Sequence, residues 1–412
     1  MNTATTRKSP TNILIVLSLC MAFQMTGFVI ILPLFARRFE SFGAGVEALG
    51  LSAMAYALTG TLAAPFIGML ADRFGRRPII LFSLSASVLA FSGYFFATSA
   101  WLMILLRGLS GVFTAGLIPA IIGSIGDLAS ENRRAQWIGI VNGGASAGWI
   151  AGPLLGGLLY DRFGYGVPFA ASIATAVGAL LLAIFLIPET YTPAAHPSQS
   201  RSVQLHGLRT LSARPIFSIL MFISFGVMFA WAFIEPQFMF YVYDDLNWTS
   251  SQLGLVMSAY GVAFMFGEFT LGRISDRLGR KPVLVLGLLL FSAQFIGLVI
   301  FRDAIWIVVS FILAGLGNAI YDPALSAYIL DIASPDYQAR IMGIKSTVGS
   351  IGNMLGPALI VMITSFVAPQ VVFLISAGLV LILTVTSGLA LHTPQLPVVP
   401  LYESQSTISQ NN

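Results

Sequence analysis

Residues 68–80 read GMLADRFGRRPII, and residues 272–284 read GRISDRLGRKPVL. Only 9% of the 412 residues are charged, so a densely charged phrase that occurs twice is unusual. The two copies share an acid, two arginines, a glycine and a proline at an offset of 204 residues (72 to 276), namely Asp72, Arg73, Gly75, Arg76 and Pro78 with Asp276, Arg277, Gly279, Arg280 and Pro282. The phrase therefore marks corresponding points of two related halves.

The composition around the phrase is that of a membrane protein. Hydrophobic residues make up 57% of the chain. Only 9% of its residues are charged, whereas about 25% are charged in a soluble domain. Stretches of about 20 apolar residues are long enough to span a bilayer as helices, and they are too continuously apolar for a β-barrel. We predict twelve such helices in an all-α membrane protein, at residues 13–35, 49–70, 79–98, 101–126, 136–159, 167–187, 216–241, 251–271, 283–301, 304–330, 340–366 and 369–391.

The loops between these spans predict the orientation. One side carries few basic residues, which are Arg37, Arg38, Arg162 and Arg302. The other side carries Arg7, Lys8, Arg73, Arg76, Arg77, Arg133, Arg134, Arg201, Arg209, Arg214, Arg273, Arg277, Arg280, Lys281, Arg340 and Lys345. Positive charge favours the cytoplasmic face, so both termini and both phrases are expected there, in a multi-pass protein of the inner (plasma) membrane. Because the net charge of +4 lies in loops between spans, no nucleic-acid partner is expected.

The same offset extends through most of the chain. It relates Gly50 to Gly254, and Gly152-Pro153 to Gly356-Pro357. Parallel repeats of this kind are typical of transporters whose substrate site lies between the halves. We expect a tail at 1–12, a six-helix bundle at 13–187, a cytoplasmic linker at 188–215, a second bundle at 216–391 and a cytoplasmic tail at 392–412.

These motifs resemble those of a known family. The repeated phrase is similar to the loop signature of the major facilitator superfamily, RGLSGVFTAG from Arg107 resembles its helix-4 motif, and GGASAGWIAGPLLGG from Gly143 resembles the helix-5 motif of its twelve-helix drug:proton antiporters. The resemblance implies two pseudo-symmetric six-helix bundles. It also implies a latch that holds the cytoplasmic side closed, formed by Gly68, Asp72, Arg73, Gly75, Arg76 and Asp127, and again by Gly272, Asp276, Arg277, Gly279, Arg280 and Asp331. The alternative is that the basic residues only fix topology.

Glycine-rich helix faces allow close packing in membranes. In the fifth span we expect most of the glycines on one tightly packed face, bent at a proline, that forms a sealed interface; simple helix packing is the alternative. Its motif residues are Gly143, Gly148, Gly152, Pro153, Gly156 and Gly157.

Charges inside a span cost about 2.5–3.5 kcal/mol on insertion scales and mark functional sites. The proton-coupling candidates are Glu235, Asp322, Glu268 and Arg107. Glu235 is favoured because Pro236 follows it and is expected to break the helix. A structural hydrogen bond is the alternative for each acid. Gln24 stands where many similar antiporters have an acid, and an amide cannot carry a proton.

Aromatic and methionine side chains adapt to varied apolar ligands. With Gln24, the expected cavity residues are Phe23, Met25, Trp149, Trp231, Phe238, Tyr260 and Tyr321. Any single aromatic residue can instead be a packing residue, because the chain has 31 phenylalanines.

The sequence thus predicts a secondary active transporter that exports amphipathic organic compounds by rocker-switch alternating access. Its partners are the lipid bilayer and a small-molecule substrate, its coupling ion is H⁺, and it is expected to work as a monomer. No nucleotide-binding loop or metal-ligating cluster is present in the sequence, so neither an enzyme nor a bound cofactor is expected. The alternatives are an uptake symporter or uniporter for a small polar nutrient, a lipid or glycolipid flippase, and a receptor that does not transport.

Overall fold

The computed structural model describes residues 10–190, 215–271, 274, 278–333 and 338–391, without the side chains of Asp72 and Ala339. Within these ranges the chain is helical, and twelve helical segments are long and apolar enough to cross a membrane. The predicted fold class is therefore confirmed. The linker and both tails lie largely outside the described residues.

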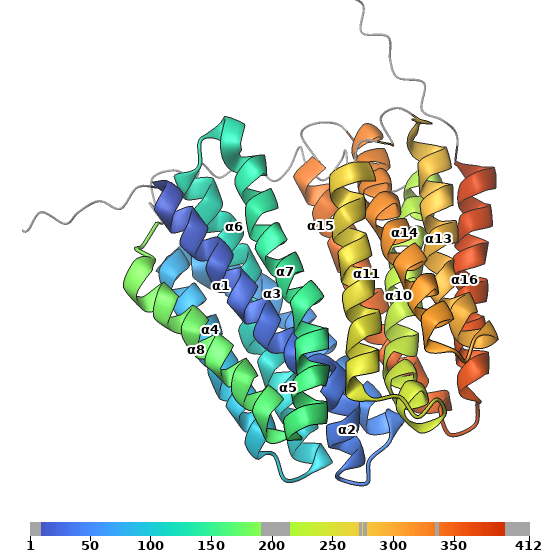
Figure 1. Ribbon diagram of the computed structural model, residues 1–412. Coiled ribbons are helices and arrows are strands. Elements are labelled where there is room, and N and C mark those ends of the chain that lie inside the picture. Colours follow the sequence, from blue (N-terminus) through green and yellow to red (C-terminus); the bar gives the residue numbers. More distant parts are fainter. Residues whose placement is uncertain (1–9, 191–214, 272–273, 275–277, 334–337, 392–412) are drawn as a thin grey trace, which may run out of the picture.

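The helices form two halves that stand side by side (Figure 1). The N-terminal half consists of α1 (Pro10–Ile31), the 3₁₀ turn η1 (Leu32–Leu34), α2 (Phe35–Glu40), α3 (Val46–Phe74), α4 (Arg76–Phe96), α5 (Ala100–Thr114), α6 (Leu117–Leu128), α7 (Glu131–Phe163) and α8 (Gly166–Leu186). The C-terminal half consists of α10 (Pro215–Asp244), α11 (Ser250–Leu271), α13 (Arg280–Ile300), α14 (Ala304–Asp331), α15 (Gln338–Ile363) and α16 (Pro369–Ala390).

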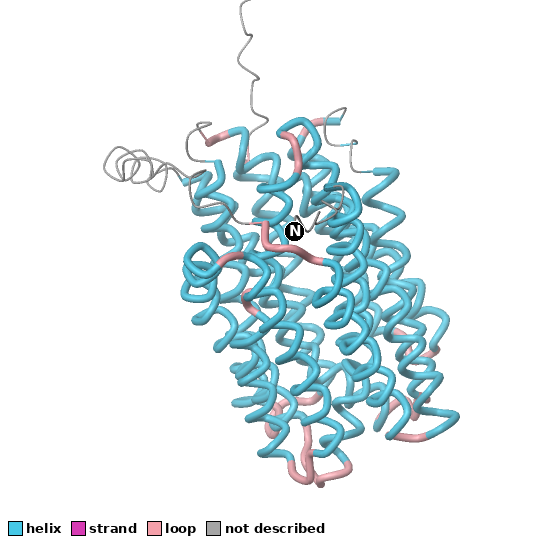
Figure 2. The backbone as a smooth tube through the Cα atoms, turned by 90° about the vertical axis from the view of Figure 1, so that its left-hand side faces the viewer, coloured by secondary structure: helices cyan, strands magenta, loops and turns pink. Residues whose placement is uncertain are grey.

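Most helices run the full length of the molecule, so the loops gather at its two ends (Figure 2). We call these the Pro10 end, where α1 begins and α4 and α13 start, and the α2 end, which carries α2. The fourth span is divided at Ala115 and Gly116 into α5 and α6. The expected break at Pro236 is wrong, because α10 continues through it to Asp244. A proline inside a helix removes one hydrogen bond without ending the helix when neighbouring helices hold it in place.

Glycines determine which helices approach most closely. A Cβ atom on Gly148 would lie 2.6 Å from the backbone nitrogen of Thr26 in α1. At the position related by the repeat, a Cβ atom on Gly352 would lie 2.5 Å from the backbone of Phe225 in α10. The pairs α1–α7 and α10–α15 are thus equivalent contacts, and the sequence repeat is also a structural one.

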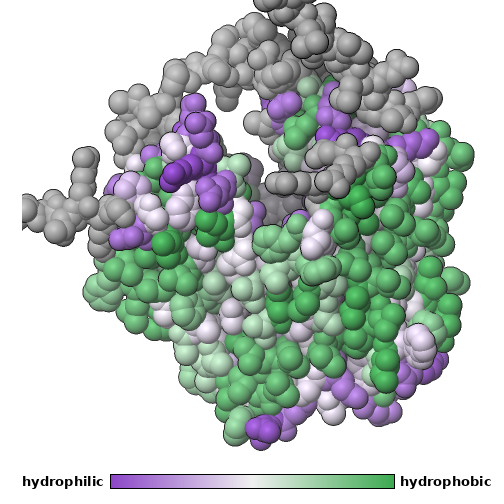
Figure 3. Space-filling view, turned by 45° about the horizontal axis from the view of Figure 1, so that its top comes forward, coloured by the Kyte–Doolittle hydropathy of each residue, from purple (hydrophilic) through white to green (hydrophobic). Residues whose placement is uncertain are grey.

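The two halves meet at the α2 end and separate toward the Pro10 end. One hydrophobic cluster joins Ile30–Leu32, Phe35 and Phe39 of the N-terminal half to α10, α11 and α14, whereas the second cluster lies within the N-terminal half, near the Pro10 end. The space-filling view shows a hollow between the halves at the Pro10 end and an apolar belt below it (Figure 3). The space between the halves is therefore open at the Pro10 end and closed at the α2 end.

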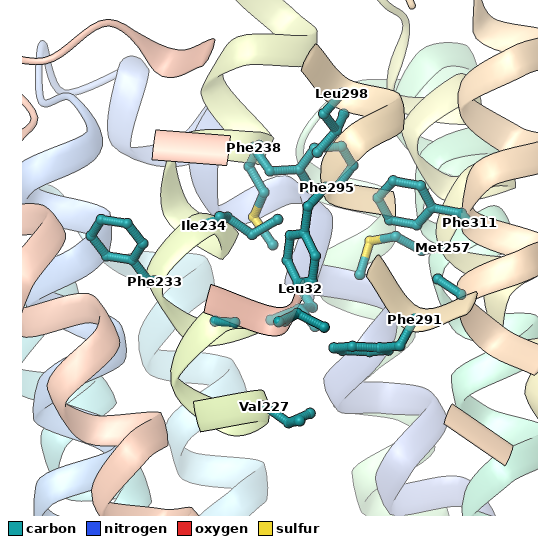
Figure 4. Packing of buried hydrophobic residues seen from close by; sticks show 14 of the residues in the cluster. Leu32, Val227, Phe233, Ile234, Phe238, Met257, Phe291, Phe295, Leu298 and Phe311 are labelled. Carbon is teal, nitrogen blue, oxygen red and sulfur yellow. The ribbon is translucent and has the colours of Figure 1, made fainter. Parts of the chain in front are cut away.

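The core of the C-terminal half is aromatic. Phe291, Phe311 and Met257 come from three different helices and point into a shared interior space (Figure 4). Phe238 packs behind them, with its ring centroid 5.1 Å from that of Phe311. This aromatic core continues directly into the wall of the cavity described next.

Candidate functional site

A cavity between the halves has three adjoining compartments. The aromatic compartment, of about 280 Å³, lies among α10, α11, α13 and α14 and faces Trp149 of α7. The N-half compartment, of about 460 Å³, shares Trp149 with it. The C-half polar compartment, of about 450 Å³, shares Tyr321 with the first and Asn353 with the second. The shared residues indicate one continuous space at the interface of the halves.

The aromatic compartment is built by helix spacing. Val227, Met228 and Trp231 form one face of α10, and Met257, Tyr260 and Phe264 form one face of α11. Residues three and four apart share a helix face, so both helices present apolar side chains to the same space. The compartment is therefore suited to apolar and aromatic groups.

Gln24 and Ser87 are two of the polar side chains in the wall of the N-half compartment. Gln24 is 4% exposed, and its Nε2 donates to Ser87 Oγ at 2.8 Å. Its Oε1 has no hydrogen-bond partner among the described residues. A buried acceptor without a partner carries a desolvation cost; Gln24 lines the compartment, but its unpaired oxygen is buried within the protein.

The C-half polar compartment contains an ion pair. Lys345 Nζ lies 2.6 Å from Asp322 Oδ1 and 2.6 Å from Ser326 Oγ. Lys345 lies inside α15, and its side chain is 14% exposed. We predicted it among the loop charges, and that prediction is wrong. Asp322 thus already has a cationic partner, which favours its structural alternative. Glu268 is exposed near the end of α11, within electrostatic range of Asp322.

Arg107 is buried beside the closed end of the cavity. It is 5% exposed, and its Nε and Nη1 have no hydrogen-bond partner among the described residues. The guanidinium carbon lies 4.6 Å from the ring centre of Tyr56 and 4.8 Å from that of Phe35. Aromatic faces stabilise a desolvated cation by up to about 2 kcal/mol, which explains how the charge is tolerated there.

Glu235 lies one helical turn beyond Trp231 on the same face of α10. Within the described chain we find no hydrogen bond or ion pair to its carboxylate, although the Arg107 charge acts on it. The Glu235 carboxylate therefore has no direct partner in the described part of the chain, and the cation that acts on it belongs to the opposite half. Glu235 thus interacts electrostatically with Arg107 across the two halves, whereas Asp322 pairs with Lys345 and has the like charge of Glu268 within electrostatic range.

The predicted cavity residues separate into two groups. Met25, Trp149, Trp231, Tyr260 and Tyr321 join Gln24 in the cavity wall. Phe23 and Phe238 line none of the three compartments. Phe23 is exposed on the outer side of α1, and Phe238 is packed behind the wall, so neither side chain is in place to contact a ligand there.

Sequence reasoning also missed several wall residues. The spacing rules did not identify Phe28, Tyr56, Asn318 and Asn353, although all four line the cavity. Asn318 is an amide inside an apolar span, a signal that could have identified it. Two spans whose residues were not among the cavity candidates also contribute to the wall, α4 with Tyr94 and α13 with Phe291.

The loop phrase forms one ion pair in each half. Arg76 Nε lies 3.6 Å from Asp127 Oδ2, and Arg280 Nε lies 3.1 Å from Asp331 Oδ2. Gly75 and Gly279 have φ angles of +100° and +90°, which L side chains rarely adopt. These two glycines permit the sharp turns into α4 and α13.

The latch role itself remains a prediction. Both ion pairs join helices of the same half, and they persist although the halves are apart at this end. Arg73 is exposed in the last turn of α3. A Cβ atom on Gly68 would meet nothing within 4 Å, so no other described helix packs closely against this latch residue. Gly272, Asp276, Arg277 and the side chain of Asp72 lie outside the described residues.

Glu189 is a further member of the first phrase that sequence reasoning missed. Its two carboxylate oxygens accept from the backbone N–H groups of Arg76 at 3.0 Å and Arg77 at 3.3 Å. An acid at a helix N-terminus satisfies free N–H groups and complements the helix dipole. Glu189 thus ties the end of the N-terminal half to the start of α4.

The fifth-span motif packs against other helices on two of its faces, and its first glycine packs against no other helix. Gly148, Gly152 and Gly156 face α1, where added Cβ atoms would meet backbone atoms. Gly157 and Pro153 face α11 of the other half instead, against Ser250 and Gly254. Gly143 has open space around it, so it does not belong to the tightly packed face. The motif therefore packs a half internally and also joins the halves.

Polar contacts hold the α2 end closed. Asp161 of α7 accepts from the backbone N–H of Ser250 at 3.1 Å and of Ser251 at 2.8 Å, and from the Ser251 hydroxyl. It therefore caps the N-terminus of α11 from the other half. Arg37 stacks on Tyr243 with its guanidinium carbon 4.0 Å from the ring centre, and the Tyr243 hydroxyl donates to Pro33 O at 3.1 Å.

Tyr165 stabilises the same end within the N-terminal half. Burial raises the pKa of Tyr165 to about 12, against the opposing effect of the nearby Arg38 charge. The hydroxyl thus stays protonated and donates to the carbonyl oxygens of Tyr94 at 2.7 Å and Phe95 at 3.0 Å. The Arg38 guanidinium carbon lies 4.0 Å from the ring centre of Tyr165. These contacts make the closed end rigid on the N-terminal side.

The comparisons with known proteins agree with this geometry. The sequence profile of the Major Facilitator Superfamily matches residues 14–244 and 220–406. The chain is 26% identical over 370 residues to the class B tetracycline resistance protein of Escherichia coli, covering 88% of this chain and 90% of that one. It is 27% identical over 384 residues to the multidrug resistance protein MdtG of Klebsiella pneumoniae (strain 342), covering 89% and 90%. Among solved structures, a bacterial homologue of the human lysosomal transporter Spinster, inward-facing and unoccupied, has a TM-score of 0.78 at 17% identity and covers 93% of this chain and 97% of that chain.

Proposed function

We propose that this chain, which belongs to the major facilitator superfamily, exports amphipathic organic compounds in exchange for protons. The family makes it a multi-pass membrane transporter and not an enzyme. Export as the direction, a bacterial inner membrane as the location and drugs as the substrate class are supported by the tetracycline and multidrug resistance proteins that it resembles.

The observation that carries the proposal is the cavity itself. It is lined by aromatic side chains, lies between two halves that meet at the α2 end, and opens toward the Pro10 end. The count of basic loop residues supports a cytoplasmic location of the Pro10 end. In that orientation the cavity takes its substrate from the cytoplasmic side, as an exporter must before it rocks to the other state.

Glu235 is the proposed proton carrier. It is free of direct partners among the described residues, whereas Asp322 is held by Lys345 and Asp127 by Arg76. When Glu235 is ionised, it is attracted to Arg107 in the opposite half, and this attraction favours closure around the empty site. When Glu235 is protonated, that attraction is lost. One proton moving across 100 mV supplies about 2.3 kcal/mol, which is enough to drive an uphill exchange.

The test is dye efflux from loaded proteoliposomes under an imposed pH gradient. Wild-type protein should export a lipophilic dye only with the gradient, and Glu235→Gln should abolish the gradient dependence. Asp244→Asn is the matched control, because Asp244 is an exposed acid at the end of the same helix. Efflux that ignores both the gradient and the Glu235→Gln change would refute the coupling mechanism.

Polar groups in the cavity support a second candidate function. Gln24, Asn353 and the Lys345–Asp322 pair form a polar wall, which would suit uptake of a small polar nutrient. The same proteoliposomes decide between the two: gradient-driven accumulation of a sugar or nucleoside, without dye efflux, would favour uptake.

A further inference from the structure

The aromatic compartment has a preformed geometry. The rings of Trp231 and Tyr260 are nearly parallel, at 17° with centroids 6.5 Å apart. Phe311 stands edge-on to both, at 77° and 71°. Edge-to-face contacts of this kind hold aromatic side chains in fixed positions. With a volume of about 280 Å³, the space is matched to one small fused-ring system.

In the largely apolar wall of the aromatic compartment, Asn318 and Tyr260 form a hydrogen-bonded polar pair. Asn318 of α14 lies seven residues after Phe311 and thus on the same helix face, and its Nδ2 donates to the Tyr260 hydroxyl oxygen at 2.7 Å. The amide nitrogen is thereby engaged and the orientation of the amide is fixed. In the described part of the chain the carbonyl oxygen of Asn318 has no hydrogen-bond partner, although the residue lines the compartment.

The geometry points to a subsite for a planar aromatic group that carries a hydrogen-bond donor. We infer that the ring stacks among Trp231, Tyr260 and Phe311 while its O–H or N–H donates to Asn318 Oδ1. This inference rests on the proposed function in one respect, since it names the substrate class of the same cavity. An analogue without the donor leaves the amide oxygen unpaired in an apolar space, which is the condition under which hydrogen-bond selectivity is strong.

Trp149 connects ligand binding in this compartment to the conformational change of the transport cycle. It comes from α7 of the opposite half and faces the same compartment. A ring bound there contacts both halves at once, so binding favours the state in which Trp149 stays close to α10 and α11. Selection of the ligand and closure of the cavity would therefore use the same ring.

The experiment compares 2-naphthol with 2-methoxynaphthalene, which share a ring system and differ in the O–H donor. Binding to the purified full-length protein in detergent is measured by equilibrium dialysis. Wild-type protein should prefer 2-naphthol by about tenfold. In Asn318→Leu the preference should fall to about one, while binding of 2-methoxynaphthalene persists and reports that the compartment is folded.

Asn142→Leu is the matched control, because Asn142 is an amide inside a span that is exposed on α7 and lines none of the three compartments. It should keep the wild-type preference. A wild-type protein that does not distinguish the two ligands would overturn the inference, and so would an unchanged preference in Asn318→Leu. Detergent binding involves no gradient and no direction, so loss of dye efflux with the preference intact would reject the export function and leave the subsite standing.

Discussion

Asp161 caps the N-terminus of α11 from the opposite half, so replacing it with alanine should loosen the closed α2 end. The change removes acceptors for the backbone N–H groups of Ser250 and Ser251 and for the Ser251 hydroxyl. In the state that opens at the α2 end, the two halves separate there and the cap is lost in any case. The substitution thus destabilises one state and leaves the other nearly unchanged.

The expected size follows from helix capping. Loss of an N-cap side chain costs about 0.5–2 kcal/mol, and Asp161 is exposed, so the charge adds little beyond the hydrogen bonds. We take about 1–2 kcal/mol, which corresponds to a shift of about fivefold to thirtyfold in the equilibrium between the two states. Asp161→Asn keeps one acceptor oxygen and should give a smaller shift.

A single reporter cysteine measures this shift. Ser258 is 5% exposed, and its Oγ accepts from the backbone N–H of Leu154 across the α7–α11 contact. In a Cys20→Ser background, Ser258→Cys is hidden while the α2 end is closed. Its rate of alkylation by an impermeant maleimide, added to whole cells, is then proportional to the population of the open state. Asp161→Ala should raise this rate about fivefold to thirtyfold.

Arg162→Ala is the matched control, because Arg162 is a charged residue at the same helix end and is exposed. Its alkylation rate should equal that of the parent. Equal rates for Asp161→Ala and Arg162→Ala would refute the role of the cap, and so would a rate in Asp161→Asn that exceeds the one in Asp161→Ala.

Gly156→Ala should lower the free energy of unfolding by about 1–3 kcal/mol, because its methyl group would meet the backbone of α1. Gly143→Ala, with open space around it, should be neutral or stabilising by up to about 1 kcal/mol; thermal melts of the two variants that coincide would contradict this. Lys345→Met should lower the melting temperature more than the double change with Asp322→Leu, because the single change leaves a carboxylate without its cation. Glu189→Ala should cost about 0.5–2 kcal/mol through the loss of the α4 cap, and a melting temperature equal to that of the parent would count against the cap.

The sequence predicted many of the cavity residues but not how they are arranged in space. Trp231, Tyr260 and Tyr321 were predicted as cavity residues because aromatic side chains suit apolar ligands, and the structure places all three in the wall. Phe23 and Phe238 met the same criterion and lie elsewhere. Composition indicates which residue types suit a cavity, whereas the rotation of each helix about its axis decides which of them face it.

The charged candidates illustrate the same limit. The sequence identified Glu235, Asp322 and Arg107 because a charge inside a span is costly wherever the helix lies. It did not distinguish a carboxylate paired with Lys345 from one without a direct partner. That distinction depends on which helices are neighbours, and helix neighbours are set by contacts between residues far apart in the chain.

By itself, the sequence determined the number of spans and the two related halves. The spans are local features, because lipid requires each of them to be apolar and self-bonded over about 20 residues. The tertiary structure alone decided which end is open, which glycines meet another helix and that Asp161 caps α11. Each of these depends on how the two halves lie against each other. The sequence repeat makes the halves equivalent but does not determine their relative arrangement, because that arrangement depends on side-chain contacts between them.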